Sequence, residues 1–211
     1  MISLDTATTF FGVAVLLGLT PGPDNLFVLA QSAAAGARAG LAVVLGLCCG
    51  LVVHTLAIAL GLAAVMASAP LALQIIQTLG AAYLLYLAWG AWRAARLPGA
   101  APSAHAAPAT PRISALWRRG VIMNLSNPKI VLFFLALLPQ FVDTSRGPAA
   151  LQIIALGLLF VLATLLVFGG ISYSAARVGD LLRQRPGVQA QLDRISALVF
   201  VALAARLVWT L

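Results

Sequence analysis

Two charged side chains stand inside apolar stretches of this sequence. Asp24 follows "LTPGP" at residues 19–23, and Lys129 follows "LSNP" at residues 125–128. Of the five acidic residues only Asp24 lies within an apolar run, and Lys129 is the only lysine. A charge at the centre of a bilayer costs about 2.5–3.5 kcal/mol even on lenient scales, so such a residue usually faces a cavity or a partner. These two side chains are the first candidates for chemistry.

Prolines accompany both charges and predict a broken helix at each. A proline lacks the N–H group and leaves a carbonyl one turn earlier without its helical partner. Broken spanning helices are tolerated where they line a cavity or are buried in protein. We expect helix-end dipoles, freed carbonyls and the titratable Asp24 to bind an ammonium group, a proton or both. The predicted binding residues are Pro21, Gly22, Pro23, Asp24, Asn25, Asn124, Asn127, Pro128 and Lys129.

A structural alternative exists for this pair, in which Asp24 and Lys129 only hold two kinked helices together. His54 is a further candidate binding residue. It lies four residues after Gly50, which lies four after Gly46, so all three share one helix face. Small residues at this spacing permit close helix packing. The histidine side chain suits proton transfer, but a neutral ring bonded to a neighbouring carbonyl explains it equally well.

The composition indicates a membrane protein. The 211 residues are 62% hydrophobic and 9% charged, and the mean hydropathy is +1.04. A soluble domain is about 45–50% apolar and about 25% charged. The net charge of +8 does not indicate nucleic-acid binding, because the arginines lie in short segments between apolar stretches and form no basic face with interleaved aromatics.

Six stretches have the roughly 20 apolar residues that a spanning helix needs. They are residues 5–32, 40–67, 71–92, 117–140, 149–175 and 192–211. A Pro- and Ala-rich segment divides the chain into a first half at 1–95, a flexible linker at 96–116 and a second half at 117–211. The predicted fold class is an all-α polytopic membrane protein with six transmembrane helices.

Orientation follows from the basic residues, which gather on the cytoplasmic side of membrane proteins. Ten of the thirteen lie in the first, third and fifth connections: Arg38, Arg93, Arg96, Arg112, Arg118, Arg119, Arg177, Arg183, Arg185 and Arg194. Both termini are therefore predicted outside and the linker in the cytoplasm. Because each half has an odd number of helices, two repeats would be inverted relative to each other, as in many secondary transporters. In this prediction the first helix of each repeat is the broken one.

Several function classes find little support in the residues. No GxxxxGK[ST] phosphate loop occurs, so energy must come from an ion gradient rather than ATP, and no cofactor is expected. No HExxH or GxSxG motif indicates an enzyme. A metal-ion or thiol carrier remains an alternative, although the adjacent Cys48 and Cys49 lack the spacing of redox or zinc sites, and no metal site is predicted.

Three segments resemble the LysE/RhtB family of amino-acid exporters. They are "LTPGPDNLFVLAQ" at 19–31, which leads into the Gly46–Gly50–His54 stretch, "LGAAYLLYLAWGAWR" at 79–93, and "RGVIMNLSNPKIVLFFLALLPQFV" at 119–142. They occur in the family's order and cover nearly the whole chain. The sequence departs from the family mainly in the linker.

The resemblance implies secondary active efflux of amino acids or related compounds across the bacterial inner membrane. It also implies proton-coupled antiport and a homodimer. The implied substrate and proton path includes Pro21, Gly22, Pro23, Asp24, Asn127, Pro128 and Lys129. The residues alone favour neither proton nor sodium coupling.

Overall fold

The computed structural model describes residues 2–20, 22–68, 70–96, 112–184 and 186–209, and the part of the chain within these ranges contains helices and no strand. The α-helices are α1 (Leu4–Leu19), α2 (Pro23–Ala35), α3 (Ala37–Ser68), α4 (Pro70–Arg96), α5 (Ile113–Leu125), α6 (Pro128–Leu132), α7 (Ala149–Gln184) and α8 (Pro186–Trp209). After α6 the chain continues as a π-helix, η1 (Phe133–Leu137), and two 3₁₀-helices, η2 (Leu138–Phe141) and η3 (Thr144–Arg146).

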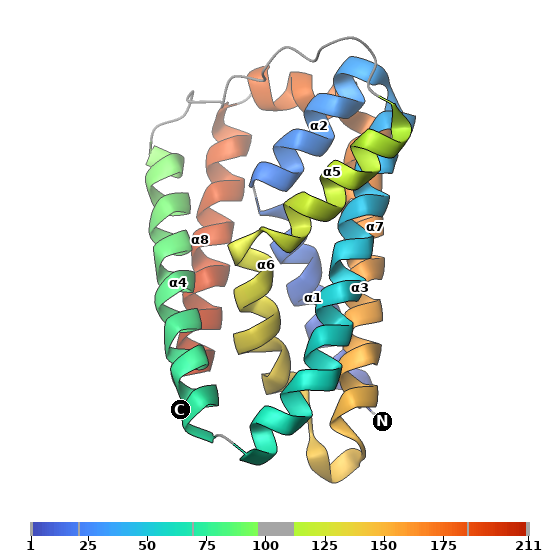
Figure 1. Ribbon diagram of the computed structural model, residues 1–211. Coiled ribbons are helices and arrows are strands. Elements are labelled where there is room, and N and C mark those ends of the chain that lie inside the picture. Colours follow the sequence, from blue (N-terminus) through green and yellow to red (C-terminus); the bar gives the residue numbers. More distant parts are fainter. Residues whose placement is uncertain (1, 21, 69, 97–111, 185, 210–211) are drawn as a thin grey trace.

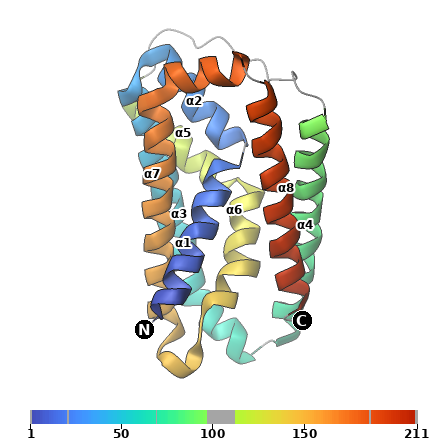
Figure 2. The same ribbon diagram turned by 180° about the vertical axis from the view of Figure 1, so that it is seen from behind.

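The long helices α3, α4, α7 and α8 form a bundle and run roughly along one direction, while α2 and α5 are tilted (Figures 1 and 2). Helices α3 and α7 pack together on one side and α4 and α8 on the other, and the broken helices α1–α2 and α5–α6 lie between these two pairs (Figures 1 and 2). The start of α1 and the end of α8 lie at one end of the bundle (Figure 1). The end of α4 and the start of α5 lie at the opposite end.

The predicted all-helical class is confirmed for the described residues, and helices cover most of each predicted apolar stretch. By length and composition two of the described helices are able to cross a membrane, over residues 37–61 and 149–175. The number rises to four if each bent pair of helices counts as one span. Most of the predicted linker, residues 97–111, lies outside the described residues, and α5 begins at Ile113, within the predicted linker.

Both predicted breaks are present. The axes of α1 and α2 meet at 63°, and those of α5 and the segment 128–141 meet at 50°. Pro23 and Pro128 stand at the start of new helices, where the absent N–H costs nothing because the first helical N–H groups have no partner. Gly22, in an extended conformation, is the N-cap of α2, and Asn127 is the N-cap of α6. Pro21 lies outside the described residues.

Backbone contact between α3 and α5 fixes the second broken helix. A Cβ added at Gly46 would overlap the carbonyl oxygen of Trp117, and one added at Gly120 would overlap that of Val43. The third small residue of this face, Gly50, lies against the side chain of Asn124. Gly46 and Gly50 thus permit close helix packing, and the helix that packs on them is α5 of the same chain.

An aromatic cluster packs the N-terminal half of α1 against η1, η2 and α7. The rings of Phe10 and Phe141 have centroids 5.1 Å apart, and those of Phe133 and Phe160 are also 5.1 Å apart. Phe134 lies 5.5 Å from Phe160, and all five side chains are buried. Aromatic pairs contribute about 0.5–1.5 kcal/mol each beyond their area burial. This cluster anchors the segment that follows the second break.

We predict that Gly46→Ala lowers the thermal unfolding temperature of the purified protein in detergent, because the new methyl group overlaps backbone that has no room to retreat. Overpacking of this kind costs about 1–3 kcal/mol. Gly90→Ala is the matched control, since Gly90 is also inside a helix and has nothing within 4 Å of the added Cβ. A Gly46→Ala protein as stable as the control would contradict the close α3–α5 contact.

Candidate functional site

A buried hydrogen bond joins the two broken helices. The side-chain amide of Asn127 donates to Oδ2 of Asp24 at 2.7 Å, and the two residues are only 7% and 5% exposed. The amide oxygen of Asn127 accepts from the backbone N–H of Lys129 at 3.0 Å and so caps α6. Asn127 therefore caps α6, the second half of its own broken helix, and also binds the carboxylate of Asp24 on the other broken helix.

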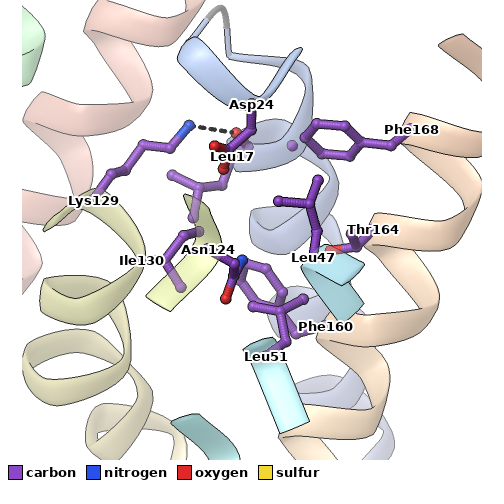
Figure 3. A pocket seen from close by; sticks show the side chains of 11 residues that line it. Leu17, Asp24, Leu47, Leu51, Asn124, Lys129, Ile130, Phe160, Thr164 and Phe168 are labelled. Atoms are coloured by element: carbon purple, nitrogen blue, oxygen red, sulfur yellow. Dashed lines mark hydrogen bonds between the residues drawn. The ribbon is translucent and has the colours of Figure 1, made fainter. Parts of the chain in front are cut away.

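Lys129 points its ammonium group at the end of α1. Its Nζ donates to the carbonyl oxygen of Leu17 at 3.4 Å (Figure 3), and a Cβ added at Gly22 would lie 3.5 Å from this nitrogen. The C-terminal end of a helix carries partial negative charge and favours a cation. Asp24 and Lys129, both among the described residues, form no ion pair within 4.0 Å. The direct pair considered as a structural alternative is thus absent, and Asn127 connects the helices instead.

Three carbonyls in the last turn of α1 have hydrogen-bond partners within the chain, so a ligand would meet fewer free carbonyls than expected. Leu16 O accepts from the N–H and hydroxyl of Thr20 at 3.0 and 2.9 Å. Gly18 O accepts from the side-chain amide of Asn25 at 2.6 Å. The chain satisfies these groups because an unpaired carbonyl in an apolar medium costs several kcal/mol. The oxygen Oδ1 of Asn25 is buried and has no hydrogen-bond partner among the described residues.

A narrow pocket lies beside these groups. The charged groups that line it come from the broken helices, and α3 and α7 contribute apolar side chains and one threonine (Figure 3). Its lining residues are Leu17, Gly18, Asp24, Leu47, Leu51, Asn124, Lys129, Ile130, Phe160, Thr164 and Phe168. The cavity measures about 20 Å³, which is room for about one water molecule. The pocket in this structure is therefore too small for an amino acid, and we call this state the closed pocket.

Asn124 connects this pocket to His54. Its side chain is 2% exposed, and its Oδ1 has no hydrogen-bond partner among the described residues. Nε2 of His54 lies 3.5 Å from the Asn124 carbonyl oxygen, and the His54 ring packs 5.7 Å from that of Phe134. His54 itself does not line the pocket. Its surroundings are those of a ring placed beside a neighbouring carbonyl.

The predicted residues other than Pro21 and His54 divide into three groups. Asp24, Asn124 and Lys129 line the pocket, and Asn25 and Asn127 hydrogen-bond at its edge. Gly22 leaves room for the ammonium group of Lys129, whereas Pro23 and Pro128 are exposed at the two breaks. Sequence reasoning did not find the wall from α3 and α7, which consists of Leu47, Leu51, Phe160, Thr164 and Phe168.

The cysteines lie away from this pocket. Cys48 is buried and Cys49 is exposed, so the two side chains point in different directions from α3, and neither lines the pocket. Within the described part of the chain no three His, Cys, Asp or Glu side chains come together as ligands for a metal ion.

We predict that Asn127→Ser weakens ligand binding at the pocket while the helix break is retained. Serine is a good N-cap residue, so α6 keeps its start, but the amide that donates to Asp24 is lost. Ser126→Ala is the matched control, because Ser126 is exposed at the same break. The measurement is ligand-induced thermal stabilisation in detergent, and equal stabilisation of both variants would contradict a role for the Asn127–Asp24 bond.

Comparison with known proteins places the chain in a family. The profile of the family described as LysE type translocator matches residues 14–210. An uncharacterized membrane protein of Vibrio cholerae is 31% identical over 188 residues, which cover 89% of each chain. A protein named leucine efflux protein, from Enterobacter sp. (strain 638), is 30% identical over 199 residues, which cover 94% of this chain and 93% of the relative.

A third relative, an uncharacterized membrane protein of Pseudomonas aeruginosa, is 32% identical over 204 residues, covering 96% of this chain and 94% of the relative. No solved structure matches this chain. The family match covers both helix breaks and all the residues that line the pocket between them. The chain therefore belongs to the LysE type translocator family, and it is a multi-pass membrane transporter rather than an enzyme.

Proposed function

We propose that this protein is a secondary active exporter of amino acids or related small amino compounds, and that it exchanges them for protons across the bacterial cytoplasmic membrane. The observation that carries the proposal is the pocket in which Asp24 and Lys129 lie together at two helix breaks without forming an ion pair. Family membership and the relative named leucine efflux protein support the same substrate class.

The charged groups of the pocket match the two ends of an amino acid. Asp24 offers a carboxylate oxygen to an ammonium group, with the unpartnered Oδ1 of Asn25 and of Asn124 as neutral acceptors nearby. Lys129 offers an ammonium group to a carboxylate. Hydrogen bonds that involve a charged partner contribute about 1.5–3 kcal/mol. A zwitterion satisfies both poles at once.

In the closed pocket the ammonium group of Lys129 occupies the position that we propose for the ammonium group of the substrate. Its Nζ binds the Leu17 carbonyl oxygen at the C-terminal end of α1, a position that favours any cation. The 3.4 Å distance is long for a hydrogen bond between nitrogen and oxygen. We infer that an arriving substrate takes this place and that Lys129 turns toward the substrate carboxylate.

Exchange for a proton follows from the single carboxylate. Asp24 holds either a substrate ammonium group or a proton, because an isolated charge in an apolar medium is costly. After the substrate is released outside, Asp24 therefore binds a proton, and the binding site turns back to the cytoplasm with Asp24 protonated. Each charge that crosses with the membrane potential supplies about 2.3 kcal/mol per 100 mV, so proton entry drives export.

For alternating access we propose six spans arranged as two inverted three-helix repeats. The packing of α3 on α7 and of α4 on α8, with one broken helix from each half between them, supports this arrangement. The arginines at the end of α4 and the start of α5 favour a cytoplasmic location for that end of the bundle, with both termini outside.

We also propose that the transporter is a homodimer, as the family resemblance implies. Because Gly46 and Gly50 contact α5 within one chain, the dimer must use a different surface. The metal-ion or thiol carrier is less well supported, since neither Cys48 nor Cys49 lines the pocket.

We predict that Asp24→Asn abolishes proton-driven transport, because the amide keeps the size of the carboxylate and carries no titratable charge. The assay is uptake of labelled amino acids into everted membrane vesicles under an imposed pH gradient, with an uncoupler as a second control. Asp5→Asn, an exposed acid in the first turn of α1, should transport normally. Uptake by Asp24→Asn with unchanged pH dependence would overturn proton coupling through this residue.

We predict that Lys129→Gln removes the preference for the amino acid over the amine that lacks its carboxylate. One charged hydrogen bond corresponds to a preference of about ten-fold or more. Competition between the two compounds for uptake measures this preference. If the wild type and the variant show the same ratio, Lys129 does not bind the carboxylate.

A further inference from the structure

One wall of the pocket has no role in the site described so far. Helix α3 contributes Leu47 and Leu51, which are one turn apart, and α7 contributes Phe160, Thr164 and Phe168 on successive turns of one face. All five residues are at least 94% buried: Leu47 and Leu51 are 1% exposed, Phe160 3%, Thr164 5% and Phe168 6%. Thr164 is the one polar residue among them.

The charged residues lie on the other side of the pocket. In Figure 3 the ammonium group of Lys129 points to the region of Asp24 and Leu17, while Leu47, Thr164, Phe160 and Phe168 lie across from Lys129. An amino acid held by Asp24 and Lys129 through its ammonium and carboxylate groups thus turns its third substituent toward α3 and α7. This wall then contacts the substrate side chain.

The wall provides no partner for a charged side chain. Four of its five members are purely apolar, and none carries a charge. A charge that leaves water for such surroundings loses its hydration without compensation, whereas an aliphatic or aromatic side chain gains free energy from burial. The wall therefore selects against cationic and acidic side chains.

We propose that Leu47, Leu51, Phe160, Thr164 and Phe168 form a side-chain subsite, and that this subsite makes neutral amino acids with apolar side chains the substrates of this transporter. The inference rests on the proposed function, because it takes Asp24 and Lys129 as the groups that hold the substrate backbone. Thr164 is its specificity-determining position, since it places a polar atom between the two phenylalanines on the same face of α7.

The first test uses the purified full-length protein in proteoliposomes with labelled leucine as the probe. Unlabelled leucine, phenylalanine, lysine and glutamate compete for its transport at equal concentrations. We expect leucine or phenylalanine to compete at least ten-fold better than lysine or glutamate. Competition by lysine or glutamate equal to that of leucine would overturn the subsite while leaving amino-acid export intact. If none of the twenty amino acids is transported, the proposed function and this inference both fail.

The second test changes the chemistry of the wall at constant size. Thr164→Asp places a carboxylate in the wall, and we expect the lysine-to-leucine transport ratio to rise at least ten-fold. Thr164→Val has the same shape without the hydroxyl group and should keep the preference for neutral side chains. An unchanged ratio in a Thr164→Asp protein that elutes as a single species in detergent would place Thr164 outside the subsite.

A third variant keeps the inference testable if Thr164→Asp does not fold. Leu51→Ala enlarges the pocket and so makes room for a larger substrate side chain. The phenylalanine-to-leucine transport ratio should therefore rise by about three-fold or more, given about 0.8 kcal/mol for each buried methylene group. Leu45→Ala is the matched control, because Leu45 lies on the same helix and is 53% exposed. Equal ratios for the two variants would overturn the assignment of Leu51.

Discussion

The hydrogen bond between Asn127 and Asp24 is the interaction on which the arrangement of the two broken helices depends. In a membrane the ends of an interrupted helix have no water to satisfy their polar groups, so they must find partners within the protein. Here each interruption supplies partners for the other. Asn127 binds Asp24, and Lys129 binds the last turn of α1. Two breaks that would each be unfavourable alone become compatible when they face each other.

The sequence predicted the parts of this arrangement that have a local signal. A carboxylate or a lysine inside an apolar run, next to proline, is conspicuous in any membrane protein. Asp24 and Lys129 were found for that reason, and the two bends follow from the same prolines. The all-helical class likewise follows from hydrophobic length and composition. Each of these features depends on a short stretch of sequence, so it can be predicted without knowing how the helices pack.

The parts that were missed or misjudged depend on packing. Leu47, Leu51, Phe160 and Phe168 belong to helices with apolar residues on every side, so no period separates the side chains that face the pocket from those that face lipid. Thr164 is a single polar residue in such a helix and belongs to no motif. Near the end of α1 the carbonyls of Leu16, Leu17 and Gly18 are paired, because the side chains of Thr20, Lys129 and Asn25 fold back onto them. Similarly, the partner of Asp24 is an amide from a residue 103 positions away, and nothing in the sequence favoured it over the cation beside it.

The glycine contact between α3 and α5 determines which parts of the pocket can move. Because Gly46 and Gly120 bring backbone against backbone, the two helices cannot slide or separate without losing that contact, and they behave as one rigid body. Leu47 and Leu51 of α3 and Asn124 of α5 therefore keep their relative positions, and we call these three residues the frame. If the pocket opens without loss of this contact, the other elements that line it, α1, α2, α6 and α7, must move relative to the frame.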